Sequence, residues 1–194
     1  SADLSDTTAC IERRPDFWDG GAQSKSNVQG LRVLSQKDND LLTLTGPGTP
    51  MGDLMRRYWI PALLSEEITE SDGPPVRVRI LGEKLVAFRD SQGRIGLIDE
   101  HCRHRGASLF YGRNEECGLR CIYHGWKFDV EGRVTDTPAE PNDAIVREGV
   151  KLAAYPTVEK GGIVFAYLGP RDKMPLFPNY SWAIAPASHR SEEH

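Results

Sequence analysis

Two short runs of cysteine and histidine, sixteen residues apart, constrain this 194-residue chain more than any other feature. The first run covers residues 102–104 (Cys-Arg-His) and the second covers residues 121–124 (Cys-Ile-Tyr-His). Each run offers one sulfur and one nitrogen at a spacing that suits a tight loop. Two thiolates and two imidazoles are a complete ligand set for a metal centre. A fold that uses them together must bring the two loops side by side.

The order of these ligands separates two kinds of metal centre. In a Rieske [2Fe–2S] cluster two histidines replace two cysteines on one iron. Cys102 and Cys121 would then bind one iron, and His104 and His124 the other. A structural zinc site also takes two Cys and two His, but it usually groups cysteine with cysteine and histidine with histidine. The mixed runs favour the iron–sulfur cluster, and a structural zinc module is the distant alternative.

The residues next to the ligands agree with this interpretation. Gly106 and Gly125 each follow a ligand histidine within two positions, and glycine permits the sharp turns and close backbone approach of a cluster loop. Trp126 stands where an aromatic ring would shield the centre from water. Cys117 precedes the second run, and we expect it to pack as a small hydrophobic residue and not to bind metal.

The same motifs resemble those of a known family. Residues 102–107 (CRHRGA) and 121–126 (CIYHGW) resemble the Rieske domain of ring-hydroxylating oxygenases. The run 39–190 is similar to the N-terminal portion of the alpha subunits in the phthalate-dioxygenase-like branch. Its further marks are the segments 41–48 (LLTLTGPG), 57–61 (RYWIP) and 113–121 (RNEECGLRC). The resemblance implies a [2Fe–2S] electron-transfer domain without the catalytic domain of those oxygenases.

Short segments between turn signals predict the fold class. Apolar and charged residues alternate over residues 76–81, and the expected strands cover residues 76–81, 84–88, 94–98, 127–130, 133–134, 152–155 and 163–168. Many short strands at this spacing predict an all-β antiparallel barrel or sandwich. The resemblance implies the Rieske-type form of this fold, with a small cluster-binding subdomain.

The chain divides into three expected parts. Residues 1–34 show no lasting periodicity and are expected to be a flexible N-terminal extension. Residues 35–169 are expected to form the Rieske domain, with cluster loops at 102–110 and 117–128. The Pro-rich segment 170–194 is expected to be a connector or tail. A short helix is expected near Ser35, with Asp38 or Asn39 as its cap, and a helix or turn is expected at 52–57.

Charge and hydropathy restrict the partners. The formal net charge is −4, and no apolar run approaches the roughly 20 residues of a membrane span. Neither nucleic acid nor a membrane is therefore expected as a partner, and the cysteine usage fits a cytoplasmic protein. The resemblance implies a reductase or ferredoxin as the electron donor, and a trimeric oxygenase assembly.

No catalytic residue is assigned. Oxygenases of this family use a mononuclear iron held by two histidines and a carboxylate, and His189 with His194 lacks that carboxylate at the family's spacing. The expected function is electron transfer to a mononuclear iron site that is absent from this chain. Such a chain is an oxidoreductase component that is not catalytically complete by itself. A free-standing Rieske ferredoxin-like carrier is the alternative, and the sequence identifies no substrate.

Overall fold

A computed structural model describes residues 33–138, 140–141 and 143–189. The chain separates into two units, residues 1–33 and 34–194, and the second unit is described here. Nearly all of the expected extension, and His194, lie outside the described residues. Within those ranges no helix is both long enough and apolar enough to cross a bilayer.

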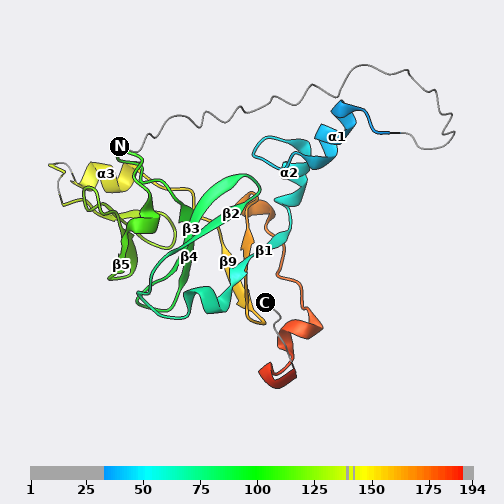
Figure 1. Cartoon of the computed structure of the whole chain (residues 1–194). Coiled ribbons are helices and arrows are strands. Elements are labelled where there is room, and N and C mark those ends of the chain that lie inside the picture. The colour runs from blue at the N-terminus through cyan, green and yellow to red at the C-terminus, as the bar shows by residue number, and fades with distance from the viewer. Residues whose placement is uncertain (1–32, 139, 142, 190–194) are drawn as a thin grey trace, which may run out of the picture. The chain divides into compact units, whose positions relative to one another are not determined.

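The strands that the structure describes in the second unit form three antiparallel sheets (Figure 1). The first contains, in spatial order, β1 (Trp59–Leu64), β10 (Ile163–Tyr167) and β9 (Thr157–Lys160). The second contains β2 (Val76–Ile80), β3 (Glu83–Arg89) and β4 (Ile95–Asp99). The third contains β5 (Arg113–Glu115), β6 (Gly118–Arg120), β7 (Lys127–Phe128) and β8 (Val134–Asp136). The all-β fold class is confirmed.

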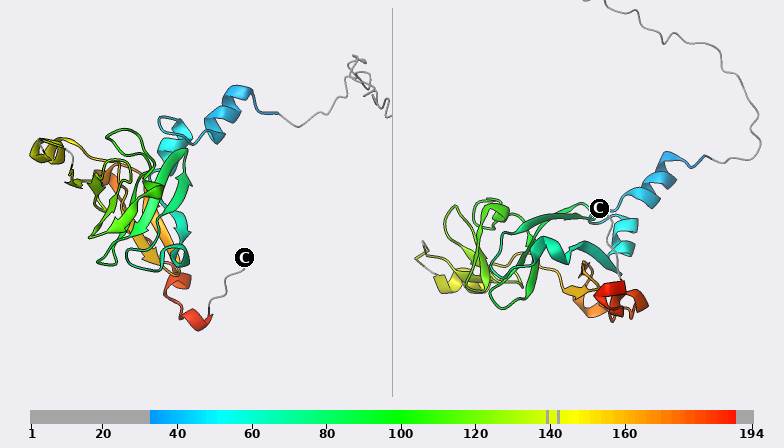
Figure 2. Two further views of the ribbon diagram at one scale, coloured as in Figure 1. Left: turned by 60° about the vertical axis from the view of Figure 1, so that its left-hand side comes forward. Right: turned by 60° about the horizontal axis from the view of Figure 1, so that its bottom comes forward.

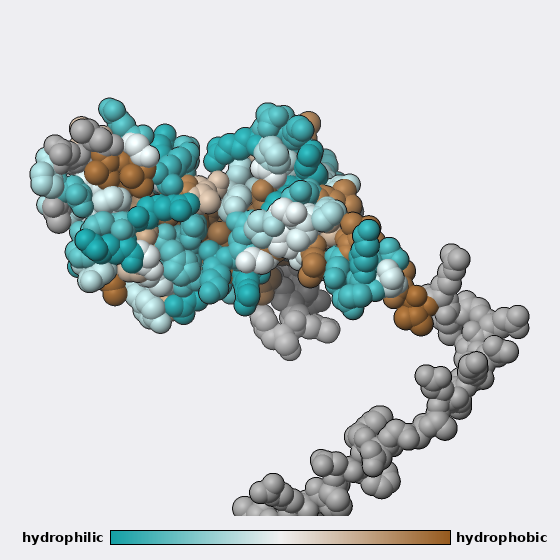
Figure 3. Space-filling model, turned by 90° about the horizontal axis from the view of Figure 1, so that it is seen from above, coloured by the Kyte–Doolittle hydropathy of each residue, from teal (hydrophilic) through white to brown (hydrophobic). Residues whose placement is uncertain are grey.

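Between residues 33 and 189, as far as they are described, three short α-helices accompany the sheets: α1 (Gln36–Thr43), α2 (Pro50–Met55) and α3 (Asp143–Gly149). The expected helix near Ser35 is present, but its cap is Ser35 itself, whose hydroxyl accepts from the N–H of Asp38 at 3.1 Å. Hydrophobic residues of α1, Leu41 and Leu42, remain about half exposed. Figure 3 shows hydrophobic atoms at the surface of the segment that leads into the grey trace.

Strand β3 lies between two hydrophobic cores. Leu85 and Ala87 pack in a core that includes residues of β1 and β10, whereas Val86 and Phe88 pack in a second core that includes Cys102 and Cys121. This division follows from the pleat, because successive side chains of a strand point to opposite faces. The right-hand view of Figure 2 accordingly shows the third sheet and α3 on one side of β2–β4, and β9 and β10 on the other. The first cluster loop therefore follows a strand, β4, whose sheet lies between the two cores.

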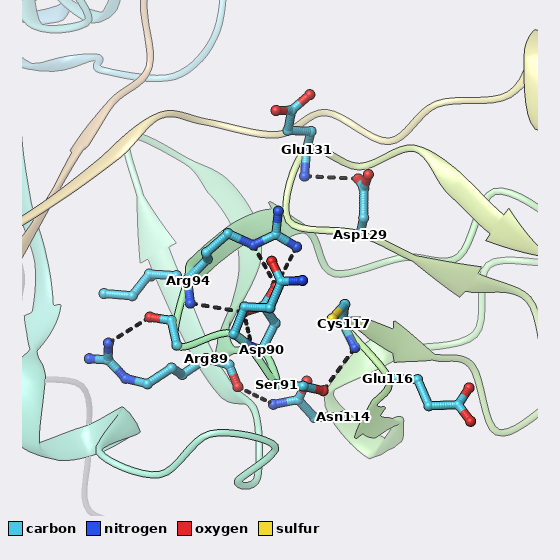
Figure 4. A network of polar contacts seen from close by, with 12 residues as sticks. Arg89, Asp90, Ser91, Arg94, Asn114, Glu116, Cys117, Asp129 and Glu131 are labelled. Atoms are coloured by element: carbon cyan, nitrogen blue, oxygen red, sulfur yellow. Dashed lines mark hydrogen bonds and ion pairs between the residues drawn. The ribbon is translucent and has the colours of Figure 1, made fainter.

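Two hairpins are closed by the same turn sequence, Asp-x-x-Gly-Arg. Buried Asp90 accepts from the backbone N–H and from the Nε of Arg94, both at 2.8 Å. Asp129 accepts from the same two groups of Arg133, both at 2.9 Å. Figure 4 shows these two turns close together. The repeated turn sets the register of β3 with β4 and of β7 with β8.

Several elements differ from the expected ones. Residues 152–155 form no strand but only an isolated bridge, Ile98 with Ala154. β1 was not expected, because Pro61 interrupts its pattern, and the structure has a register shift between Pro61 and Leu63. β5, β6, β9 and α3 are each only three to seven residues long, too short for periodicity to reveal them.

Candidate metal centre

The two cluster loops have the same backbone hydrogen bonds. In the first loop the N–H of Cys102 donates to the carbonyl five residues on (2.9 Å), and its own carbonyl accepts from the N–H of Gly106 (2.8 Å). The second loop repeats both bonds from Cys121, at 2.8 Å to the carbonyl five residues on and 3.1 Å from Gly125. Both glycines have the left-handed φ, +71° and +77°, that residues with a Cβ adopt at a cost. The loops are thus two copies of one clip, which face a common space.

The two cysteines lie at the inner side of that space. Cys102 and Cys121 are each 3% exposed and belong to the second core. Burial raises the pKa of the Cys102 thiol to about 11; the backbone N–H groups of His104 and Arg105 act to lower it, and the neighbouring Cys121 acts to raise it. Two buried thiols side by side become thiolates only when a bound cation offsets their charge. The pair therefore has the chemistry of metal ligands.

The two histidines lie at the outer side. The imidazoles of His104 and His124 are half-buried, with ring centroids 4.5 Å apart. His104 is stacked on Trp126, and His124 contacts the exposed ring of Tyr123 at 3.9 Å between centroids. Among the described residues, the buried Nδ1 of His104 and the buried Nε1 of Trp126 have no hydrogen-bond partner. Such atoms are rare in native proteins unless an additional group satisfies them.

The four side chains meet as two pairs, sulfur with sulfur and nitrogen with nitrogen. In the described part of the chain, no three Cys, His, Asp or Glu side chains converge closely enough to hold a single metal ion. Tetrahedral zinc needs four ligands around one point, whereas a Rieske cluster needs two sulfurs at one iron and two nitrogens at the other. The paired arrangement and the unpartnered Nδ1 of His104 fit the two-iron cluster, and the zinc alternative is not favoured.

Arg120 braces the second loop. Its guanidinium, only 14% exposed, donates to the carbonyl of Gly125 (2.7 Å), to Asp136 (2.7 Å) and to Glu115 (2.6 Å). The loop carbonyl is thereby held against two strands of the third sheet. Nothing in the sequence separates Arg120 from the other arginines near the ligands, because its partners lie in β5, in β8 and in the second loop, at spacings that form no motif.

Glu100 braces the first loop. Its carboxylate accepts from Ser108 (2.6 Å) and from Arg77 (2.9 Å). Burial alone would raise the pKa of Glu100, but the hydrogen bonds from Ser108 and Arg77 bring it below its usual value. Arg77 also covers the ring of Phe110 at 3.9 Å, a cation–π contact. Both ends of the first loop are therefore fixed to the second sheet.

Cys117 and His189 were also considered as possible ligands in the sequence, and the structure describes the surroundings of both. Cys117 is half-buried in the β5–β6 turn with a φ of +61°, and its N–H donates to the hydroxyl of Ser91 at 2.9 Å (Figure 4). It thus lies in a strained turn, outside both hydrophobic cores. His189 ends the described part of the chain in a short 3-10 helix, Ala187–His189. Its suggested partner, His194, lies outside the described residues.

Curated relatives share most of this chain. The phthalate 4,5-dioxygenase oxygenase subunit of Pseudomonas putida is 51% identical over 151 residues, covering 78% of this chain and 34% of that protein. The tert-butanol monooxygenase/tert-amyl alcohol desaturase oxygenase subunit of Aquincola tertiaricarbonis is 47% identical, covering 88% and 36%. The chain thus spans about a third of the length of these relatives.

Solved structures share the fold. Dicamba monooxygenase with non-haem iron and dicamba superposes with a TM-score of 0.61 at 26% identity, covering 69% of this chain and 40% of that one. The complex of oxygenase and ferredoxin of carbazole 1,9a-dioxygenase gives a TM-score of 0.54 at 34% identity, covering 62% and 31%. The model of the Rieske [2Fe-2S] domain family matches residues 58–156, which include both cysteine–histidine loops. The chain belongs to the Rieske [2Fe-2S] domain family, as a homologue of the N-terminal part of Rieske oxygenase alpha subunits.

Proposed function

We propose that Cys102 and Cys121 bind one iron of a [2Fe–2S] cluster and that His104 and His124 bind the other. The observation that supports this most is the pairing of the two clips, with buried sulfurs inside and half-buried imidazoles outside. When bound, such a cluster supplies one-electron oxidation and reduction at a potential above that of all-Cys clusters. The protein holds the ligands in place through Arg120 and Glu100.

The chain's own residues control access to this centre. Trp126, 5% exposed, closes the side next to His104, and a drier site strengthens local electrostatics. On the other side His124 lies beside Tyr123, which with Ile122 is 61% exposed. Exposed apolar and aromatic residues next to a redox ligand are suited to contact with a protein. We infer that electrons enter from a donor that docks on Ile122 and Tyr123.

The donor is proposed to be a reductase or ferredoxin, and the acceptor a mononuclear iron site of a trimeric non-haem iron oxygenase. The relatives are oxygenase subunits, and one solved neighbour is a complex of an oxygenase with its ferredoxin. These similarities support an electron-transfer role for the domain.

The electron-transfer role is tested by anaerobic reduction with an NADH-dependent reductase and its ferredoxin, followed by the loss of visible absorption. We expect Tyr123→Asp to slow this reduction several-fold while dithionite still reduces the protein fully. Ile184→Asp is the matched control, because Ile184 is 70% exposed in the C-terminal segment. A wild-type protein that dithionite reduces but no protein donor does would contradict the proposed role.

A further inference from the structure

A third segment, residues 137–138 and 140–141, completes the walls of the metal centre. It turns on itself through the N–H of Glu140, which donates to the carbonyl of Thr137 at 3.0 Å. Pro138 packs so closely on the second loop that a Cβ on Gly125 would lie 2.9 Å from its Cγ. Glu140 reaches the first loop, where its Oε1 lies 3.7 Å from the Nε2 of His104. One short turn therefore touches both cluster loops.

The two nitrogens of His104 have different surroundings. Nδ1 is buried and has no partner among the described residues, so it is the nitrogen directed at the centre. Nε2 is on the opposite side of the ring and faces the carboxylate of Glu140. One face of the ring is covered by Trp126, with 6° between the planes. His104 is thus held by contacts at its face and at its outer nitrogen.

A carboxylate next to the outer nitrogen of a metal-bound histidine has two physical effects. It favours the tautomer that keeps the proton on Nε2, which leaves Nδ1 free to bind metal, and it raises the basicity of the ligand. Its negative charge also favours the more positive, oxidised state of the site. The distance of 3.7 Å exceeds that of a direct hydrogen bond, so both effects are exerted through the charge of the carboxylate. The side chains are 21% and 26% exposed, so solvent screens this interaction only in part.

We propose that Glu140 is a positioning residue that orients His104 through its outer nitrogen and lowers the reduction potential of the centre. This inference rests on the ligand assignment of the proposed function. This carboxylate comes from a turn outside both cysteine–histidine loops. His124 has a different neighbour, Tyr123, so the two histidine ligands are not equivalent.

The test compares the wild type with Glu140→Gln, Glu140→Ala and the control Glu148→Gln. Glutamine is isosteric with glutamate and removes only the charge, and Glu148 is an exposed residue of α3 whose substitution changes the net charge equally. Midpoint potentials are measured by redox titration at one pH, with EPR as the readout. For Glu140→Gln and Glu140→Ala we expect a positive shift, with the reduced-to-oxidised ratio at fixed potential increasing by up to about tenfold, or about 59 mV for one electron.

The midpoint potential of the control, Glu148→Gln, should shift by less than half as much as that of Glu140→Gln. Glu140→Gln should retain the iron content and the EPR line shape of the wild type, whereas Glu140→Ala should also alter the hyperfine couplings of one imidazole. An unshifted Glu140→Gln potential, a shift no larger than that of Glu148→Gln, or loss of iron from Glu140→Gln would overturn the inference while leaving the ligand assignment intact. A wild-type protein without a Rieske spectrum would overturn both.

Discussion

The indole of Trp126 lies flat on the imidazole of His104, with ring centroids 4.8 Å apart and 6° between the planes. The two residues come from different loops, so this contact joins the loops directly. Trp126 also packs on Phe128 of β7 at 6.5 Å between centroids and is nearly buried. It therefore transmits the rigidity of the third sheet to a ligand of the first loop.

Replacing Trp126 with alanine should destabilise the protein and loosen His104. Truncation of a buried Trp leaves a cavity and typically costs about 3–5 kcal/mol, and here the stack on the ligand is lost as well. Trp126→Phe retains an aromatic ring and should lose less. Urea unfolding followed by far-UV circular dichroism, together with iron content, measures both effects. Equal stability of the two variants would show that Trp126 is not a structural link between the loops.

Gly106 and Gly125 form a matched pair for testing the third segment. Both have a left-handed φ, but a Cβ at Gly106 meets nothing within 4 Å, whereas at Gly125 it meets Pro138. We expect Gly106→Ala to cost about 1–2 kcal/mol for the backbone alone and Gly125→Ala to cost clearly more. The double variant Gly125→Ala/Pro138→Ala should recover part of the difference. Identical unfolding free energies for the two single variants would mean that Pro138 does not press on the second loop.

The pair of Glu115 and Arg120 predicts an acid-dependent contribution to stability. The hydrogen bond from Arg120 lowers the pKa of Glu115 below its usual 4.5. A folded-state pKa below the unfolded one stabilises the protein above the unfolded value, and this stability is lost as the pH falls through the folded value. Glu115→Gln should therefore destabilise the protein at pH 7 and lose less stability than the wild type between about pH 5 and pH 3. Parallel stability curves for the two proteins over this range would contradict the pairing.

The sequence predicted the longer strands before the first cluster loop better than the short strands and side chains that hold the proposed ligands. The strands between residues 76 and 98 were predicted to within one or two residues, because strands and their turns follow local rules of pleat and turn chemistry. The strands β5 and β6 were not predicted, because a strand of three residues is too short to show a periodicity. The ligand assignment itself stays a prediction until metal is measured in the protein.

The third segment could not be read from the sequence for a different reason. Pro138 and Glu140 have no motif that relates them to residues 102–125, and only the turn after β8 brings them to Gly125 and His104. Arg120 is a similar case, because its role in holding the second loop depends on three hydrogen-bond partners that only the tertiary fold brings together. Long-range contacts of this kind follow from the fold and not from spacing.

The most direct test of the account is metal analysis of the purified protein combined with EPR of its dithionite-reduced form, for the wild type, Cys121→Ala and Cys117→Ala. We expect about two irons per chain, a mixed-valence signal with couplings to two imidazole nitrogens, loss of the signal in Cys121→Ala, and an unchanged signal in Cys117→Ala. One zinc per chain with no signal, or a full Rieske signal in Cys121→Ala, would contradict the ligand assignment on which the account rests.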